Sequence, residues 1–151
     1  MNRIEVTGIL AYLDRLGILA FKPGMDDAWF DVVSHLSADD AMTAARRLAA
    51  QALPDGRFVV RPGDVIDAVG QIRRERIRAV LDGSLPCPPP DIDPDDVPAY
   101  QAWRRSFMRA LGDGRTLHDA ETVACEAAGI PPVHRPVEVH RAPNFRQIGG
   151  T

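Results

Sequence analysis

The sequence predicts an all-α protein, and three observations support this prediction. Apolar residues recur at the three- and four-residue spacing of an amphipathic helix in six segments. These segments are bounded by residues that favour helix caps or turns. The one extended stretch, Phe58-Val59-Val60, is too short to form a sheet. We expect, in chain order, a four-helix domain over residues 1–82, a proline- and aspartate-rich linker over 83–97, a helical hairpin over 98–129 and a disordered tail over 130–151.

The first two predicted helices are amphipathic. The first should run from about residue 3 to 17, with Asn2 as its N-cap and Glu5 completing a capping box. The second should span about 26–36 and places Trp29 on its apolar face. Two aspartates in its first turn suit the positive end of the helix dipole.

The third and fourth predicted helices complete the N-terminal domain. Ser37 is an N-cap candidate for a third helix that ends near residue 53. This helix is rich in alanine, so it should pack close to its neighbours. Pro62 fits the first turn of a fourth helix, where a missing N–H costs no hydrogen bond, and that helix should run to about residue 81.

A change in composition marks the boundary that follows. Residues 83–97 are dominated by proline and aspartate, and the acidic side chains from Asp82 to Asp96 have no basic residue among them. A helix interior cannot form through such a run of prolines. We therefore expect an extended, solvated, semi-rigid spacer.

Two further helices are predicted beyond the spacer. The fifth, over about 98–111, carries an apolar stripe of Tyr100, Trp103, Phe107 and Leu111. Three basic residues lie beside or opposite that stripe, namely Arg104, Arg105 and Arg109. The sixth, over about 116–128, has an alanine- and valine-rich stripe. A hairpin of this size is not stable alone, so it must pack against another part of the chain or against a partner.

Composition excludes some classes of protein. The 151 residues are 45% hydrophobic and carry a formal net charge of −3. No stretch approaches the roughly 18 to 20 apolar residues of a membrane-spanning helix, and the N-terminal residues lack a signal-peptide pattern. We expect a cytoplasmic protein that does not enter a membrane. The net acidity also disfavours nucleic-acid binding over the whole surface.

No catalytic, cofactor or metal site is expected. The sequence has no glycine-rich phosphate loop and no nucleophile elbow. Its four histidines lie on different predicted elements or in the tail: His35, His118, His134 and His140. The aspartates of the linker lack the glycine and the final glutamate of a calcium loop. The protein is therefore not expected to be an enzyme.

An arginine cluster ends the fourth predicted helix and is the first candidate partner-binding feature. Its members are Arg73, Arg74, Arg76 and Arg78. Arg73 and Arg76 fall within the same arc as the apolar stripe of the helix, where a fully packed helix would not place them. One interpretation is that the C-terminal half of the helix leaves the core and projects toward a phosphate or an acidic partner. In the other, the arginine stems lie along the core edge and the guanidinium groups reach water.

Trp103 and Phe107 are the second candidate feature. An aromatic stripe at helical spacing is usually part of a core. In a short hairpin beyond a linker, the same stripe could instead anchor the chain in a groove of a partner. The sequence leaves both interpretations open.

The N-terminal 80 residues resemble the bacteriophage replicative-helicase loader and inhibitor family, including related proteins of actinobacterial phages and prophages. The resemblance lies in the order of features, which are an amphipathic opening helix over Glu5–Leu16, the tryptophan-bearing Ala28–Leu36, the Ser37–Ala41 start of an alanine-rich helix, the entry Arg61–Ile66 and the arginine-rich Ile72–Arg76. It implies a small helical N-terminal domain and a flexible C-terminal part that engages the helicase. The hairpin predicted here departs from that flexible part.

The resulting hypothesis is a non-enzymatic adaptor that binds a replicative DNA helicase or another replication protein. The predicted partner-binding residues are the four arginines of the cluster, together with Trp103 and Phe107. Two alternatives stay open. One is a DNA-binding regulator that uses the arginine-rich fourth helix, and the other is a phage protein that binds a different host protein. The sequence leaves the oligomeric state open.

Overall fold

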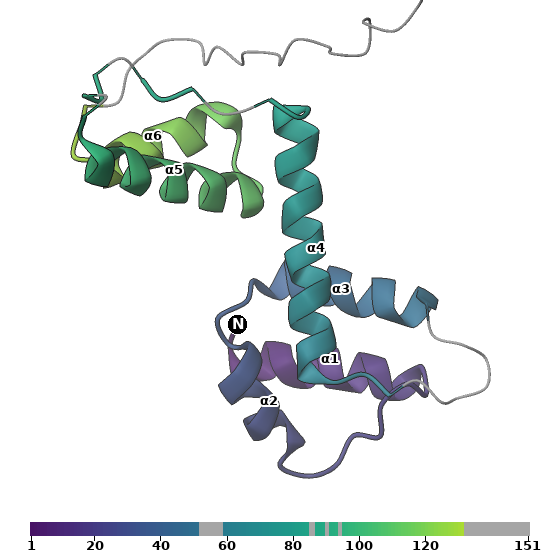
Figure 1. The fold of residues 1–151 in the computed structure, drawn as a ribbon. Helices are drawn as coiled ribbons and strands as arrows, with labels where there is room; N and C mark the ends of the chain where they lie inside the picture. Colours follow the sequence, from purple (N-terminus) through teal and green to yellow (C-terminus); the bar gives the residue numbers. More distant parts are fainter. Residues whose placement is uncertain (52–58, 85–86, 90, 94, 132–151) are drawn as a thin grey trace, which may run out of the picture. The chain divides into compact units, whose positions relative to one another are not determined.

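The computed structural model describes residues 1–51, 59–84, 87–89, 91–93 and 95–131. Within these ranges all regular structure is helical, which confirms the all-α class (Figure 1). The helices are α1 (Arg3–Arg15), α2 (Met25–Val33), α3 (Ala38–Gln51), α4 (Pro62–Leu81), α5 (Val97–Gly112) and α6 (Leu117–Ala127). All six lie where the apolar periodicity predicts them, and the largest shift is at the end of α2, at Val33 instead of near Leu36. Residues 132–151, in the predicted tail, lie outside the described residues.

The chain divides into two compact units, Met1–Ile72 and Arg73–Thr151. The division lies inside α4 and not at the linker, where we expected it. The reason is that α4 contributes to two separate cores. Ile72 is the last residue of the first core, whereas Ile77 and Leu81 pack in the second.

The core of the N-terminal unit is built from α1, α2, α3 and the first half of α4. The apolar stripe of α1 is buried, and Leu10 and Leu13 have no exposed surface. Three alanines of α3 are equally inaccessible, namely Ala41, Ala44 and Ala45. Small side chains allow a close approach between helices, and α3 contacts α1 as expected of an alanine-rich helix.

Local signals set the ends of α1. The Asn2 side chain accepts a hydrogen bond from the Glu5 N–H at 2.9 Å, and the Asn2 N–H donates to the Glu5 carboxylate at 2.6 Å. This is the predicted capping box. At the other end Gly17 adopts a left-handed φ of +72°, and the Ile18 N–H donates to the Leu13 carbonyl at 3.2 Å. Such a glycine-based cap satisfies carbonyls that have no partner inside the helix.

The C-terminal unit is organised around the α5–α6 hairpin (Figure 1). Asp96 caps α5 by accepting from the Ala99 N–H at 3.0 Å, and Thr116 caps α6. The Trp103 and Phe107 rings stack with their centroids 5.0 Å apart. The buried residues of this core are Leu81, Ile92, Trp103, Phe107, Ala110, Leu111, Ala120, Ala124 and Cys125.

The described part of residues 83–97 is not a wholly solvated spacer. Ser84, Pro89 and Ile92 are buried, and Ile92 belongs to the second core. The physical reason is that a hairpin of two helices cannot cover both sides of an aromatic stripe. Leu81 and Ile92 supply part of the missing apolar cover.

None of the described helices is both long enough and apolar enough to cross a lipid bilayer.

Candidate functional site

Trp103 and Phe107 lie in the core of the C-terminal unit. Each has about 1% of its surface exposed, and together they are the two largest fully buried side chains described. A hot-spot side chain must reach its partner, and neither ring is accessible in this fold. Trp103 and Phe107 were predicted to contact a partner, but in this structure they lie in the core and not on the surface.

Arg73 and Arg76 contact the C-terminal end of α5. Arg73 forms an ion pair with Asp113, the C-cap residue of α5. The Arg76 guanidinium donates to the Gly112 carbonyl at 3.1 Å. Cations are favoured at this end of a helix because its last carbonyls lack partners within the helix and carry partial negative charge.

Gly112 makes this contact possible. A Cβ atom built on Gly112 would lie 3.3 Å from Nε of Arg73, so the arginine side chain would have to shift by a few tenths of an ångström to accept a larger residue. Of the two interpretations left open by the sequence, these contacts favour the one in which the stems of Arg73 and Arg76 lie along the edge of a core. Their position on the apolar arc of α4 is explained by packing on α5.

Arg74 and Arg78 are placed differently from the other two arginines of the cluster. They lie four residues apart on α4, and both are exposed. Neither has an ion-pair partner among the residues that the structure describes. The four predicted arginines thus do not form one surface, because two are held by α5 and two remain accessible.

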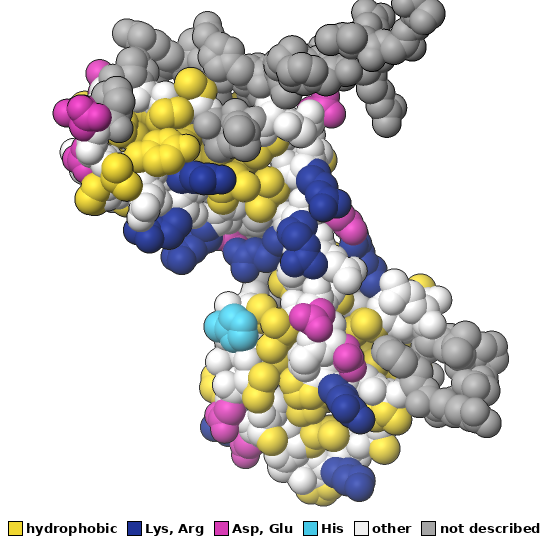
Figure 2. All heavy atoms as spheres, viewed as in Figure 1, with side chains coloured by type: hydrophobic (Ala, Val, Ile, Leu, Met, Phe, Trp, Pro, Cys, Tyr) yellow, Lys and Arg dark blue, Asp and Glu magenta, His cyan; other side chains and the backbone are white. Residues whose placement is uncertain are grey.

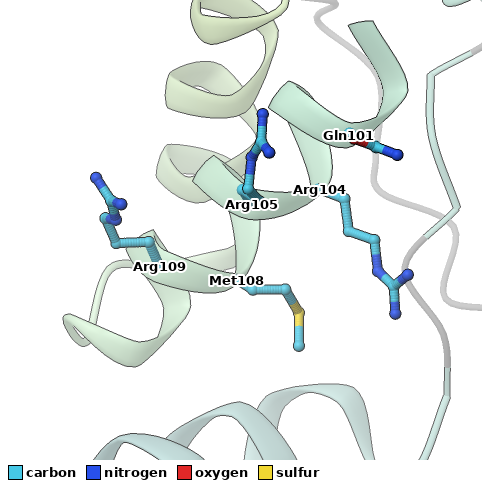
Figure 3. A pocket seen from close by; sticks show the side chains of 5 residues that line it. All are labelled: Gln101, Arg104, Arg105, Met108 and Arg109. Carbon is cyan, nitrogen blue, oxygen red and sulfur yellow. The ribbon is translucent and has the colours of Figure 1, made fainter. Parts of the chain in front are cut away.

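A different set of residues forms the most distinctive exposed surface of this unit. We call it the outer face of α5, and it consists of Gln101, Arg104, Arg105, Met108 and Arg109. These residues line an open hollow of about 580 Å³ (Figure 3). In the close-up, Arg105 and Arg109 extend to one side of the helix, whereas Arg104 and Met108 extend to another.

The spacing of the outer face is that of a helix-packing surface. Its positions follow the pattern i, i+3, i+4, i+7 and i+8, which places five side chains on one side of a helix. On the other side of α5, Trp103, Phe107 and Leu111 are buried in the core, and Tyr100 is half-buried against it. Because Trp103 and Phe107 fix the inner side of α5, the outer side is presented on a helix with a defined orientation.

The outer face is strongly basic. Arg104, Arg105 and Arg109 are exposed, and α5 contains no acidic residue between Val97 and Gly112. No ion pair is formed by these three arginines within the described part of the chain. Figure 2 shows Lys and Arg side chains gathered over α5 and the second half of α4. The acidic side chains of this unit lie mainly before α5 and on α6.

Arg104, Arg105 and Arg109 were expected beside or opposite the aromatic stripe, but they were not among the predicted partner-binding residues. Two signals in the sequence could have identified them. One is the second stripe at helical spacing, and the other is the absence of acidic residues over the whole helix. The denser cluster at residues 73–78 drew the interpretation toward α4 instead.

Glu121 is a buried carboxyl group in the same unit. It lies on α6 with 8% of its surface exposed, and its Oε2 atom has no hydrogen-bond partner among the residues that the structure describes. Burial raises its pKa, while the nearby His118 acts in the opposite direction. No cluster of three or more His, Cys, Asp or Glu side chains suited to a metal ion occurs among the described residues.

No known protein-family model, curated protein or solved structure matches this chain.

Proposed function

We propose that this protein is a non-enzymatic adaptor that binds a partner protein through the outer face of α5. The observation that carries the proposal is the pairing of three exposed arginines with a buried aromatic stripe on one helix. The stripe holds the helix in place, and the arginines offer charge-assisted hydrogen bonds to a partner. Arginine and methionine are both enriched in protein–protein interfaces.

The partner that we propose is a replicative DNA helicase of an actinobacterial host. This identity comes from the family resemblance, in which the N-terminal part is a small helical domain and the C-terminal part engages the helicase. The division of this chain into two units is compatible with that arrangement. The adaptor would hold or block the helicase and needs no ATPase site of its own.

Capture by the purified helicase tests this proposal. The full chain is passed over immobilised helicase, and the same is done with the triple variant Arg104→Gln, Arg105→Gln, Arg109→Gln. We expect the parent to be retained and the variant to be lost, because glutamine keeps the helix propensity but removes the charge.

The matched control removes three exposed charges from the N-terminal unit through Arg15→Gln, Arg46→Gln and Arg61→Gln. It should be retained like the parent. Equal retention of all three proteins would show that the outer face is not the contact. Failure of the helicase to retain the parent would contradict the identity of the partner.

A DNA-binding regulator is the second candidate, and Arg74 and Arg78 favour it. They are exposed at i and i+4 on α4 without ion-pair partners in the described structure. Phosphate-driven binding is strongest at low salt. A titration with duplex DNA under those conditions should show binding that Arg74→Gln with Arg78→Gln weakens. A flat titration would remove this candidate.

A further inference from the structure

We infer that the outer face of α5 recognises an acidic amphipathic helix, in which two carboxylates one helical turn apart lie beside an apolar side chain. This inference deepens the proposed function and rests on its claim that the outer face is the partner-binding surface. It names the chemistry of the partner segment and does not depend on which protein carries that segment.

The arginine spacing specifies the carboxylate spacing. Arg105 and Arg109 are four residues apart, which separates their positions by about 6 Å along the helix axis. Figure 3 shows that both side chains extend to the same side of α5. Carboxylates at i and i+4 of a second helix have the same separation, so two charge-assisted pairs can form at once without distortion of either helix.

Met108 specifies the apolar component. It is the one apolar side chain of the outer face, it is half-buried, and it extends on the side of α5 that Arg104 shares. Methionine adapts its shape to the side chain it meets and is common at surfaces that bind amphipathic helices. The open hollow beside it has room for an apolar side chain of a partner.

A protein helix fits this surface better than a nucleic acid. Bases bind single-strand proteins by stacking on exposed aromatic rings. Two of the three rings of α5, Trp103 and Phe107, are buried, and the third, Tyr100, is half-buried and stacked on Trp103. The same unit also carries exposed aspartates before α5, such as Asp91 and Asp93, whose charge disfavours the approach of a long polyanion. A short acidic segment needs only the three arginines.

Fluorescence anisotropy with a designed probe tests the inference on the full chain. The probe is a labelled alanine- and leucine-based peptide of about 16 residues, long enough to form a helix. It has glutamates at i and i+4 and a leucine at i+3, on the adjoining part of the same helix face. A second peptide has glutamine in place of each glutamate. A third probe is an oligothymidylate with the same number of negative charges.

We expect the acidic peptide to bind at low ionic strength and the glutamine peptide and the oligonucleotide to bind much more weakly. Arg105→Gln with Arg109→Gln should weaken the acidic peptide about tenfold. The control pair Arg15→Gln with Arg46→Gln removes the same charge from the N-terminal unit and should leave the affinity unchanged.

Any one of four results would overturn the inference. Equal weakening by the control pair would show that only bulk charge matters. Equal binding of the glutamine peptide would show that carboxylates are not recognised. Tighter binding of the oligonucleotide, lost in the Arg105 and Arg109 variant, would make the surface a nucleic-acid site.

Helicase capture without peptide binding would reject this inference alone, whereas peptide binding without helicase capture would reject only the proposed helicase.

Discussion

Phe107 is the residue on which the stability of the C-terminal unit should depend most clearly. It is fully buried and stacks on Trp103. Phe107→Ala removes this contact and leaves a cavity, so we expect a loss of about 3 to 5 kcal/mol in the free energy of unfolding. Urea unfolding can follow this unit alone, because Trp29→Phe leaves Trp103 as the single tryptophan of the chain.

The matched control is Val97→Ala in the same Trp29→Phe background. Val97 is 54% exposed on the same helix, and its loss should change the free energy of unfolding by no more than about 0.5 kcal/mol. Similar midpoints for the two variants would mean that Phe107 is not in the core.

Glu121 should make the stability of this unit depend on pH. Burial holds the pKa of its carboxyl above the ordinary value of 4.5, so the folded state binds the proton more tightly than the unfolded chain. The resulting stabilisation is complete below pH 4.5 and is lost as the pH rises through the raised pKa. Glu121→Gln should flatten this dependence in urea unfolding followed by Trp103 fluorescence. The exposed Glu126→Gln should keep it, and an unchanged profile in both variants would contradict the assignment.

At the scale of the helices, two glycines should respond to alanine in opposite directions. Gly114 ends α5 with a φ of +83°, a conformation that costs other residues about 1 to 2 kcal/mol. Gly8 lies inside α1 with open space around it, so alanine should stabilise that helix by about 1 kcal/mol. Thermal unfolding, followed by Trp103 for Gly114→Ala and by Trp29 for Gly8→Ala, checks both signs. Changes of the same sign would contradict these backbone conformations.

The positions of the helices could be predicted from the sequence because local signals set them. The Asn2 capping box, Pro62 at the start of α4 and the apolar stripes all act within a few residues along the chain. Residues 83–97 were wrongly predicted to be wholly solvated, because the burial of Ile92 depends on contacts with residues that are distant in sequence. Composition indicates solvation there, whereas Ile92 packs in a core with α5 and α6.

The same distinction applies to the candidate site. The sequence could show that Trp103 and Phe107 form a stripe, but not whether that stripe faces a core or a partner. It showed that Arg73 and Arg76 lie on the apolar arc of α4, but the reason is the end of α5, thirty-six residues from Arg76 along the chain. The sequence shows the second stripe that contains Arg104, but only the structure establishes that this stripe is exposed while Trp103 and Phe107 are buried.

At the scale of the whole molecule, the two cores should respond separately to core substitutions. Leu10 belongs to the first core and Phe107 to the second. Leu10→Ala should shift the unfolding midpoint reported by Trp29, and Phe107→Ala should shift the midpoint reported by Trp103. Single-tryptophan variants measured in urea separate the two signals. A common shift of both probes in either variant would mean that the chain unfolds as one cooperative unit.

The central claim is that exposed arginines on α5 bind the partner while the aromatic side of the helix holds the fold. The most direct test is a titration of the ATPase rate of the purified helicase with the full chain and with the Arg104, Arg105, Arg109 triple glutamine variant. The account predicts a saturable change in ATPase rate with the parent and no change with the variant, although the variant retains the unfolding profile of the parent. An equal change with both proteins would contradict the role of the outer face, and no change with either would contradict the helicase as partner.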